Sequence, residues 1–273
     1  KISYPSIDSL RLEDQQIDPY LLFTITDANG KVVRHIKASA KKGLNKITWD
    51  YRTNSSAGVH EKFVPSADQL FASTEQGSMV APGKYTVQLA KVEDGVLTNI
   101  GETQTFNCKL LDNSSIKTEF NANVAFYEKV SDIRRAVGAA DDLFSNMQSR
   151  VKSIDQAIIA MPASSKVYLE KSHALRKELN SIALKLRGDE TRAKREFETL
   201  PSISDRVFGI QGNIWNSIAP VPQMYVESYE IASKQFIEVL AAMKKLHASI
   251  EALERELEIN NAPYTPGRWP EWK

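Results

Sequence analysis

Four histidines and one cysteine are the side chains of this sequence best suited to bind a metal ion or attack a substrate. The sequence contains no His-x-x-x-His, Cys-x-x-Cys or His-Glu-x-x-His spacing, no glycine-rich phosphate loop and no Gly-x-Ser-x-Gly turn. His60, which precedes Glu61, is a marginal metal candidate. We therefore predict a non-catalytic chain without a cofactor. The histidines lie in four separate stretches, at His35, His60, His173 and His247.

Cys108 is the only cysteine, so no internal disulfide can form. Alternation places Phe106, Cys108 and Leu110 on one face of an expected strand. A nucleophilic thiol would need a neighbouring base or cation, and none is apparent nearby. We interpret Cys108 as a small buried apolar side chain.

The last residues of the chain concentrate aromatic side chains in a stretch that cannot be helical. Residues 261–273 contain three prolines, and Tyr264, Trp269 and Trp272 are costly to leave in water. The favoured interpretation is that this tail packs back along the helices or the strands. The other is that it docks onto a missing domain or another protein. The candidate docking or binding residues are Tyr264, Arg268, Trp269 and Trp272, with His60 and Phe63 from an earlier loop.

Charge and hydropathy exclude several classes of partner. Lys and Arg total 35 against 34 Asp and Glu, which gives no electrostatic case for nucleic acid or an anionic membrane. The apolar runs are far shorter than the roughly 20 residues that span a bilayer. The chain has no initiator Met and no visible signal peptide, so we expect a mature or excised piece of a larger protein.

The elements that must position these residues begin with strands. Asn29-Gly30 between two β-prone runs predicts a hairpin, and residues 44–52 alternate with Leu44, Ile47 and Trp49 as expected inward positions. Further turns and strands follow up to about residue 111. We predict an antiparallel β-sandwich over 1–112, interrupted at 53–81 by an insertion that is either a binding loop or a structural excursion across the sandwich edge.

After a linker at 113–121, the apolar period changes to that of helices. A 4-3-4-3 spacing predicts an antiparallel bundle of three to four helices over 122–260, with four in up-down order as the simplest closure. Breaks are expected at 161–165, at Gly188, and at Pro220 and Pro222, and Ser202 to Asp205 resembles a capping box. The longest seams contain Phe126, Val130, Ile133, Val137, Ala140, Phe144, Met147, Val151, Ile154 and Ile158, and Tyr225, Tyr229, Ala232, Phe236, Val239, Met243, Leu246, Ile250, Leu253 and Leu257.

Three stretches carry a resemblance to known proteins. Residues 43–52 (GLNKITWDYR) and 81–87 (APGKYTV) are similar to the Ig-like module of flagellar hook-cap proteins, which also ends many secreted bacterial proteins. With residues 262–272 (APYTPGRWPEW), the chain resembles the C-terminal region of bacterial sortilin-like proteins with BNR (Asp-box) repeats, many of which are labelled glycosyl hydrolases. The resemblance implies an exported protein, periplasmic, cell-surface or secreted, with a β-propeller upstream. No Asp-box repeat occurs in these residues, so no catalytic residue can be transferred.

Together these observations predict a structural and interaction module that positions or docks the propeller or an envelope protein. The first alternative is an accessory module that binds a carbohydrate or a peptide through aromatic residues around the 53–81 loop. The second is part of a glycosyl hydrolase whose active site lies outside this chain. A composite site within the chain would need two facing carboxylates in a pocket.

Overall fold

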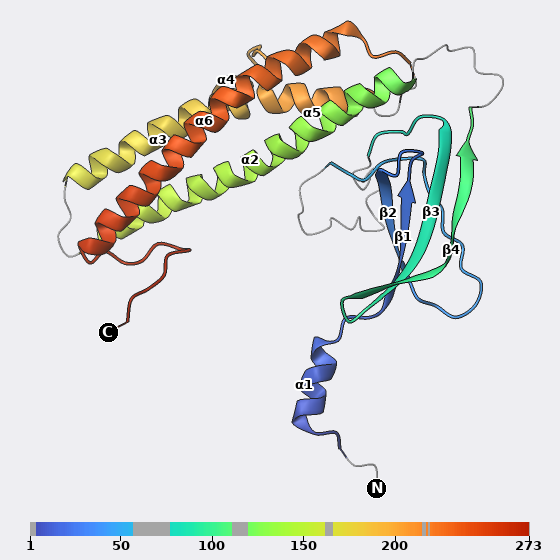
Figure 1. The fold of residues 1–273 in the computed structure, drawn as a ribbon. Coiled ribbons are helices and arrows are strands. Elements are labelled where there is room, and N and C mark those ends of the chain that lie inside the picture. Colours follow the sequence, from blue (N-terminus) through green and yellow to red (C-terminus); the bar gives the residue numbers. More distant parts are fainter. Residues whose placement is uncertain are drawn as a thin grey trace. The chain divides into compact units, whose positions relative to one another are not determined.

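The chain folds as an antiparallel sheet followed by helices. The computed structural model describes residues 4–56, 77–110, 120–161, 166–214, 217 and 219–272. One compact unit holds the strands and a second holds the helices from Phe126 onward (Figure 1). The first element, helix α1 (Ile7–Gln15), begins at Ser6, whose side chain accepts a hydrogen bond from the Ser9 amide, and contributes no buried residue.

Two hairpins build the sheet, whose strands are β1 (Tyr20–Thr26), β2 (Val32–Ser39), β3 (Gly83–Glu93) and β4 (Val96–Cys108), in the order β2-β1-β3-β4. All neighbours are antiparallel. The predicted Asn29-Gly30 hairpin is confirmed: the Asp27 carboxylate accepts hydrogen bonds from the amides of Asn29 and Lys31, and Gly30 has a positive φ. Asp94 and Gly95 both have positive φ, as a two-residue hairpin turn requires.

The segment 44–52 was predicted as a strand, and this is wrong. It runs as irregular chain with a single bridge, between Arg52 and Met79, and Leu44 is fully exposed. Of the three expected inward residues only Trp49 is half-buried; its ring lies 5.4 Å from that of Tyr85 and 5.8 Å from that of Phe106. Ring packing therefore holds this segment against the sheet, and a hydrogen bond from the Trp49 indole to the Arg52 carbonyl orients the ring within the segment.

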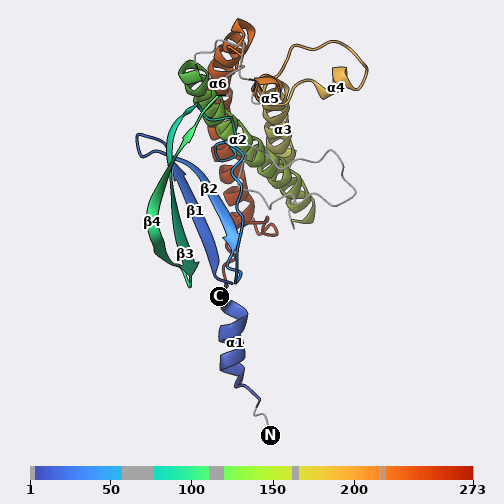
Figure 2. The same ribbon diagram turned by 90° about the vertical axis from the view of Figure 1, so that its right-hand side faces the viewer.

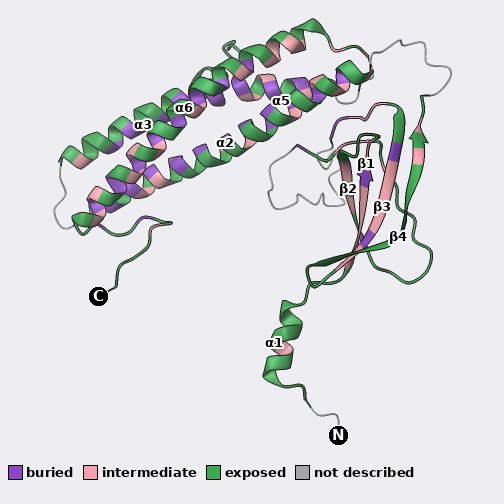
Figure 3. Cartoon of the chain, viewed as in Figure 1, coloured by how far each residue is buried: buried purple, intermediate pink, exposed green. Residues whose placement is uncertain are grey.

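A second sheet, which the predicted sandwich requires, is not found among the residues that the structure describes. Those residues contain one four-stranded sheet, in which β1 and β3 are mostly half-buried and β4 is mostly exposed, with Ile25, Tyr85 and Ala90 as its buried apolar positions (Figure 3). A single antiparallel sheet with one apolar and one polar face produces the same alternation of residues as a sandwich. In this chain the Trp49 ring covers part of the apolar face, at Tyr85 and Phe106.

The two ends of the 53–81 insertion meet. The Thr53 amide donates to the Ser78 carbonyl at 2.9 Å, and the Val80 amide donates to the Tyr51 carbonyl at 2.9 Å. Residues 57–76, including His60 and Phe63, lie outside the described part of the chain.

Gly77 lies at this junction without room for a side chain, because a Cβ would clash with the backbone oxygens of Thr53 and Asn54. We expect Gly77→Ala to lower the free energy of unfolding by about 1–3 kcal/mol, the usual cost of overpacking. Gly83→Ala, where a Cβ would meet nothing within 4 Å, is the control and should change it by no more than about 0.5 kcal/mol. Urea unfolding followed by near-UV circular dichroism measures both, and equal stability of the two variants would contradict the packing described.

The helices bury the predicted seams. Helices α2 (Phe120–Ala160), α3 (Lys166–Leu186), α4 (Glu190–Ala193), α5 (Ile203–Ile214) and α6 (Gln223–Ile259) follow in order. Val130 to Ile158 of the first seam and Ala232 to Leu257 of the second are buried at every predicted position, as the purple stripes in Figure 3 show. None of the described helices combines the length and apolarity needed to cross a membrane.

The direction of the helices differs from the predicted up-down order of four. Phe126 packs on Tyr229 and Arg150 binds Glu254, so α2 and α6 run parallel. Asp155 accepts from Ser172 while Asp141 pairs with Arg187, so α3 runs antiparallel to α2. In α5, Phe208 lies against Arg134 and Ile210 against Val130, so α5 is also antiparallel to α2.

Helices α3 and α5 therefore occupy one position of a three-helix bundle, end to end (Figure 1, Figure 2). Gly188 has a φ of +97°, and a Cβ there would lie 3.6 Å from the Cβ of Ser202. The chain between α3 and α5 therefore ends beside the residue at which it began. There the Ser202 side chain accepts a hydrogen bond from the Asp205 amide and the Asp205 side chain accepts one from the Ser202 amide, which is the predicted capping box. The up-down prediction failed because it counted breaks in the chain as reversals of direction.

Candidate docking site at the carboxyl-terminal tail

The tail leaves α6 through a defined helix cap. Asn261 has a φ of +57°, its amide donates to the Glu258 carbonyl at 3.0 Å, and the Ala262 amide donates to the Leu257 carbonyl at 3.0 Å. This is a Schellman motif, in which the left-handed residue is asparagine and the apolar contact is that of Ala262 with Leu257. The cap fixes the direction in which the tail leaves the helix.

A turn then brings the tail back to α6. Pro266 and Gly267, the latter with a φ of +88°, occupy the central positions of a turn closed by a hydrogen bond from the Arg268 amide to the Thr265 carbonyl. The Arg268 guanidinium binds Glu258 with two bonds, Nε to Oε1 at 2.5 Å and Nη2 to Oε2 at 2.8 Å. Thr265 is buried, so the turn is held both by packing and by a paired charge.

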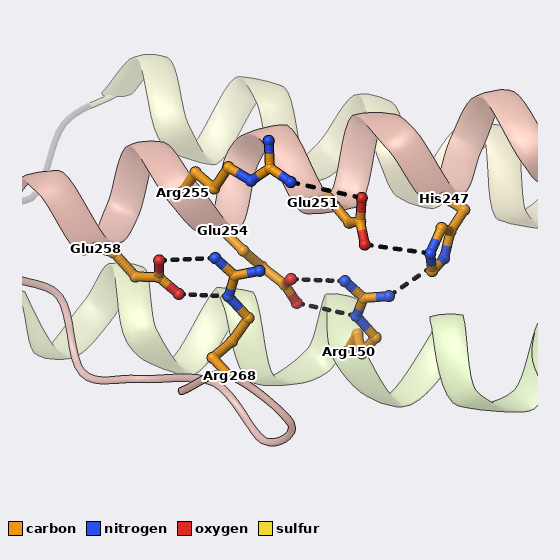
Figure 4. A network of polar contacts seen from close by, with 7 residues as sticks. All are labelled: Arg150, His247, Glu251, Glu254, Arg255, Glu258 and Arg268. Carbon is orange, nitrogen blue, oxygen red and sulfur yellow. Dashed lines mark hydrogen bonds and ion pairs between the residues drawn. The ribbon is translucent and has the colours of Figure 1, made fainter. Parts of the chain in front are cut away.

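Glu258 belongs to a row of charged residues on one face of α6 (Figure 4). One turn earlier, Glu254 is 1% exposed and receives Nε and Nη2 of Arg150 from α2 at 3.1 and 2.6 Å. His247 lies 3.2 Å from the same guanidinium and 3.4 Å from Glu251. The helix surface that anchors the tail is therefore itself tied to α2 by a buried ion pair.

The Arg268–Glu258 pair should depend on pH in a defined direction. The hydrogen bond from Arg268 lowers the pKa of Glu258, and the same bond raises the pKa of Arg268. The pKa of Glu258 is lower in the folded than in the unfolded chain. The pair therefore stabilises the fold fully when the pH is above the ordinary glutamate pKa of about 4.3, and this stabilisation is lost as the pH falls through the lowered pKa.

We therefore expect the tail to stay anchored at neutral pH and to detach on acidification below the ordinary range of glutamate. The NMR resonance of the Arg268 Nε–H reports this directly, and Glu258→Gln should already show the detached position at neutral pH. A resonance that is unchanged between neutral pH and the acid limit, or identical in Glu258→Gln, would show that the pair does not hold the tail.

The aromatic rings of the tail are not all covered by this anchor. Trp269 is 92% exposed and Trp272 98%, while Tyr264 is 46% exposed and its hydroxyl accepts a hydrogen bond from the Glu271 amide at 3.0 Å. The favoured prediction, that the tail packs back and so removes its aromatic rings from water, is wrong for Trp269 and Trp272; the tail is held to α6 through Arg268 instead. The two indole rings stand in solvent.

Of the predicted site residues, the structure describes the four of the tail, while His60 and Phe63 lie outside the described residues. The tail brings Tyr264, Arg268, Trp269 and Trp272 together within nine residues of chain. Arg150 and Glu254 were missed by sequence reasoning, because nothing local distinguishes them from the other charged residues of the helices. The one available signal was the position of Glu254 directly beside the seam residue Leu253.

Among the described residues, the other chemistry-bearing groups form no site. Burial raises the pKa of the Cys108 thiol, which lowers its thiolate fraction. Burial also raises the pKa of Tyr85 to about 12, and its hydroxyl donates to the Ala81 carbonyl at 2.6 Å. A surface hollow lies at the β3–β4 hairpin and includes Glu93, whose carboxylate binds Lys91. The described residues contain no cluster of three metal-binding side chains.

Comparisons with known proteins add no further assignment to this geometry. The chain matches no family model, no curated protein and no solved structure. The resemblance to sortilin-like proteins therefore stays a prediction, and the tail must be interpreted from its own geometry.

Proposed function

We propose that this chain is a non-catalytic structural and interaction module that docks onto a partner through its carboxyl-terminal tail. One observation carries the proposal: two fully exposed indole rings lie on a short segment whose preceding turn is fixed to the helices by the Arg268–Glu258 pair.

Exposed tryptophans on a held segment suit binding for a physical reason. Burying an aromatic side chain removes about 150–250 Å² of surface from water, so two rings provide a large driving force in few residues. A segment already ordered before binding loses less conformational entropy when it binds. Pro270, between the two tryptophans, restricts the backbone further.

For the partner we propose the upstream β-propeller of the same exported bacterial protein, or an envelope protein. This rests on the resemblance of residues 43–52, 81–87 and 262–272, as do an Ig-like identity for the strand region and a periplasmic, cell-surface or secreted location. Under this proposal any glycosyl hydrolase activity of the parent protein lies outside this chain.

Carbohydrate binding is the second candidate, since flat aromatic rings can also stack on sugars. On the sheet, Tyr85 is buried and Trp49 is half-buried against it, so neither offers a free face. Among the described aromatics, Trp269 and Trp272 are the ones best placed for this role, so both candidates use the same residues.

The experiment compares three forms of the chain as bait: wild type, Trp269→Ala/Trp272→Ala, and the control Phe197→Ala/Leu200→Ala. The control removes two exposed apolar side chains from the same unit, 61% and 88% exposed. The targets are the upstream part of the parent protein and a glycan array. We expect wild type and control to capture the upstream part, and the tryptophan variant to lose about thirtyfold or more in affinity.

Capture that survives the tryptophan double substitution would contradict the proposed tail site. Binding to glycans alone, lost in the same variant, would replace the docking function by the carbohydrate-binding one.

A further inference from the structure

The segment that carries the two exposed tryptophans, residues 269–272, is held at a second point beyond the Arg268 anchor. The Tyr264 hydroxyl accepts a hydrogen bond from the Glu271 amide at 3.0 Å. In the part of the chain that the structure describes, this is the one hydrogen bond that residues 269–272 form. The tail from Tyr264 to Glu271 is therefore a closed loop.

Tyr264 is suited to close this loop because its own backbone is fixed on both sides. It stands between Ala262 and Thr265, which are 7% and 6% exposed, and it directly follows Pro263, whose ring restricts the backbone. At 46%, its exposure is about half that of either tryptophan. The hydroxyl is therefore presented from an ordered part of the tail.

Each exposed indole lies next to one of the two fixed points. Trp269 directly follows Arg268, and Trp272 directly follows Glu271. Without the bond at Glu271, the described contacts would leave Pro270 as the one restriction on the backbone beyond Arg268. The position of the second ring relative to the first would then vary.

We propose that Tyr264 is the positioning residue of the docking site, whose hydroxyl fixes the spacing of Trp269 and Trp272 before a partner binds. This inference rests on the proposed docking function, and it gives Tyr264 a role other than contact with the partner. Two rings held at a fixed spacing can be buried together. In a loose segment the second ring must be ordered on binding, which costs conformational entropy.

Tyr264→Phe removes the hydroxyl and keeps the ring, so it tests this role in the full chain without a partner. We expect the backbone NMR order parameters of the Glu271 and Trp272 amides to fall from about 0.8, near that of rigid backbone, to about 0.6 or less. Tyr225→Phe is the matched control, because it removes the same atom from a ring whose hydroxyl forms no hydrogen bond with the described residues. The control should leave both order parameters unchanged. The melting temperature should be the same in all three forms, because the bond orders the tail alone.

Titration calorimetry of the same three forms with the upstream part of the parent protein then measures the effect on docking. We expect Tyr264→Phe to raise the Kd by about threefold to tenfold, the usual effect of losing one hydrogen bond. The control should bind as tightly as wild type. The expected loss is smaller than that for removal of both indoles, because the rings themselves remain.

Equal order parameters in wild type and Tyr264→Phe would overturn the proposal. Weaker binding without loosening would also overturn it, since the hydroxyl would then contact the partner directly. So would loosening without any loss of affinity. If the wild type binds no upstream part, the docking function itself fails, whereas the order parameters still show whether the hydroxyl holds the tail.

Discussion

Arg150→Ala is expected to lower the free energy of unfolding by about 3–5 kcal/mol, because it leaves the Glu254 carboxylate buried without its partner. Glu254 is 1% exposed and the Arg150 side chain 14%, so water cannot replace the two lost hydrogen bonds without opening the bundle. Urea unfolding followed by far-UV circular dichroism measures the change.

Two further variants separate the pair from its surroundings. Arg150→Met/Glu254→Leu removes both charges at once and should be within about 1 kcal/mol of wild type, or more stable. Arg255→Ala removes an exposed guanidinium 4.0 Å from Glu251 and should cost at most about 0.5 kcal/mol. If Arg150→Ala were as mild as Arg255→Ala, the ion pair would not be buried as described.

Ile158→Ala is expected to cost about 2–5 kcal/mol, whereas Ile159→Ala should change stability by no more than about 0.5 kcal/mol. Ile158 is fully buried in the seam between the helices and Ile159 is 76% exposed. The two substitutions remove the same atoms from neighbouring residues, so the difference reports burial alone. The same unfolding experiment measures both.

Comparable costs at the two positions would mean that the seam is not where the 4-3-4-3 spacing places it. A large cost at Ile159 alone would mean that α2 is rotated about its axis relative to the arrangement described.

The helical half was largely predictable because its signal is local and repeated. A residue such as Val137 or Ile250 is one of ten that recur with the helical period, so one face of each long helix could be assigned without knowing its neighbours. The helical period does not reveal whether two neighbouring helices run parallel or antiparallel. The return of the chain from Gly188 to Ser202 decides that α3 and α5 share one position, and this is a long-range fact.

The strand half was less predictable because irregular chain that packs a single aromatic ring can show the same alternation of apolar and polar residues as a strand. Asn29-Gly30 has a strict conformational requirement and was assigned correctly. The run from Leu44 to Arg52 contains β-prone residues, yet side chains and not a strand ladder hold it to the sheet: the Trp49 ring packs on Tyr85, and Asp50 lies 4.0 Å from Arg34 of β2.

The candidate site divides in the same way. The prolines and aromatics of the tail could be identified in the sequence as unsuited to a helix and costly in water. That Arg268 binds Glu258 while the tryptophans face solvent depends on the turn at Pro266 and Gly267 and on the cap at Asn261. These geometries combine several residues, and composition alone does not determine them.

Hydroxyl-radical footprinting of Trp269 and Trp272, in this chain alone and after addition of the upstream part of the parent protein, tests the docking proposal most directly. We predict that both rings react rapidly in the isolated chain and become protected in the complex, while Phe197 stays equally reactive in both. Rings that are already protected in the isolated chain, or that stay fully reactive in the complex, would contradict the proposal.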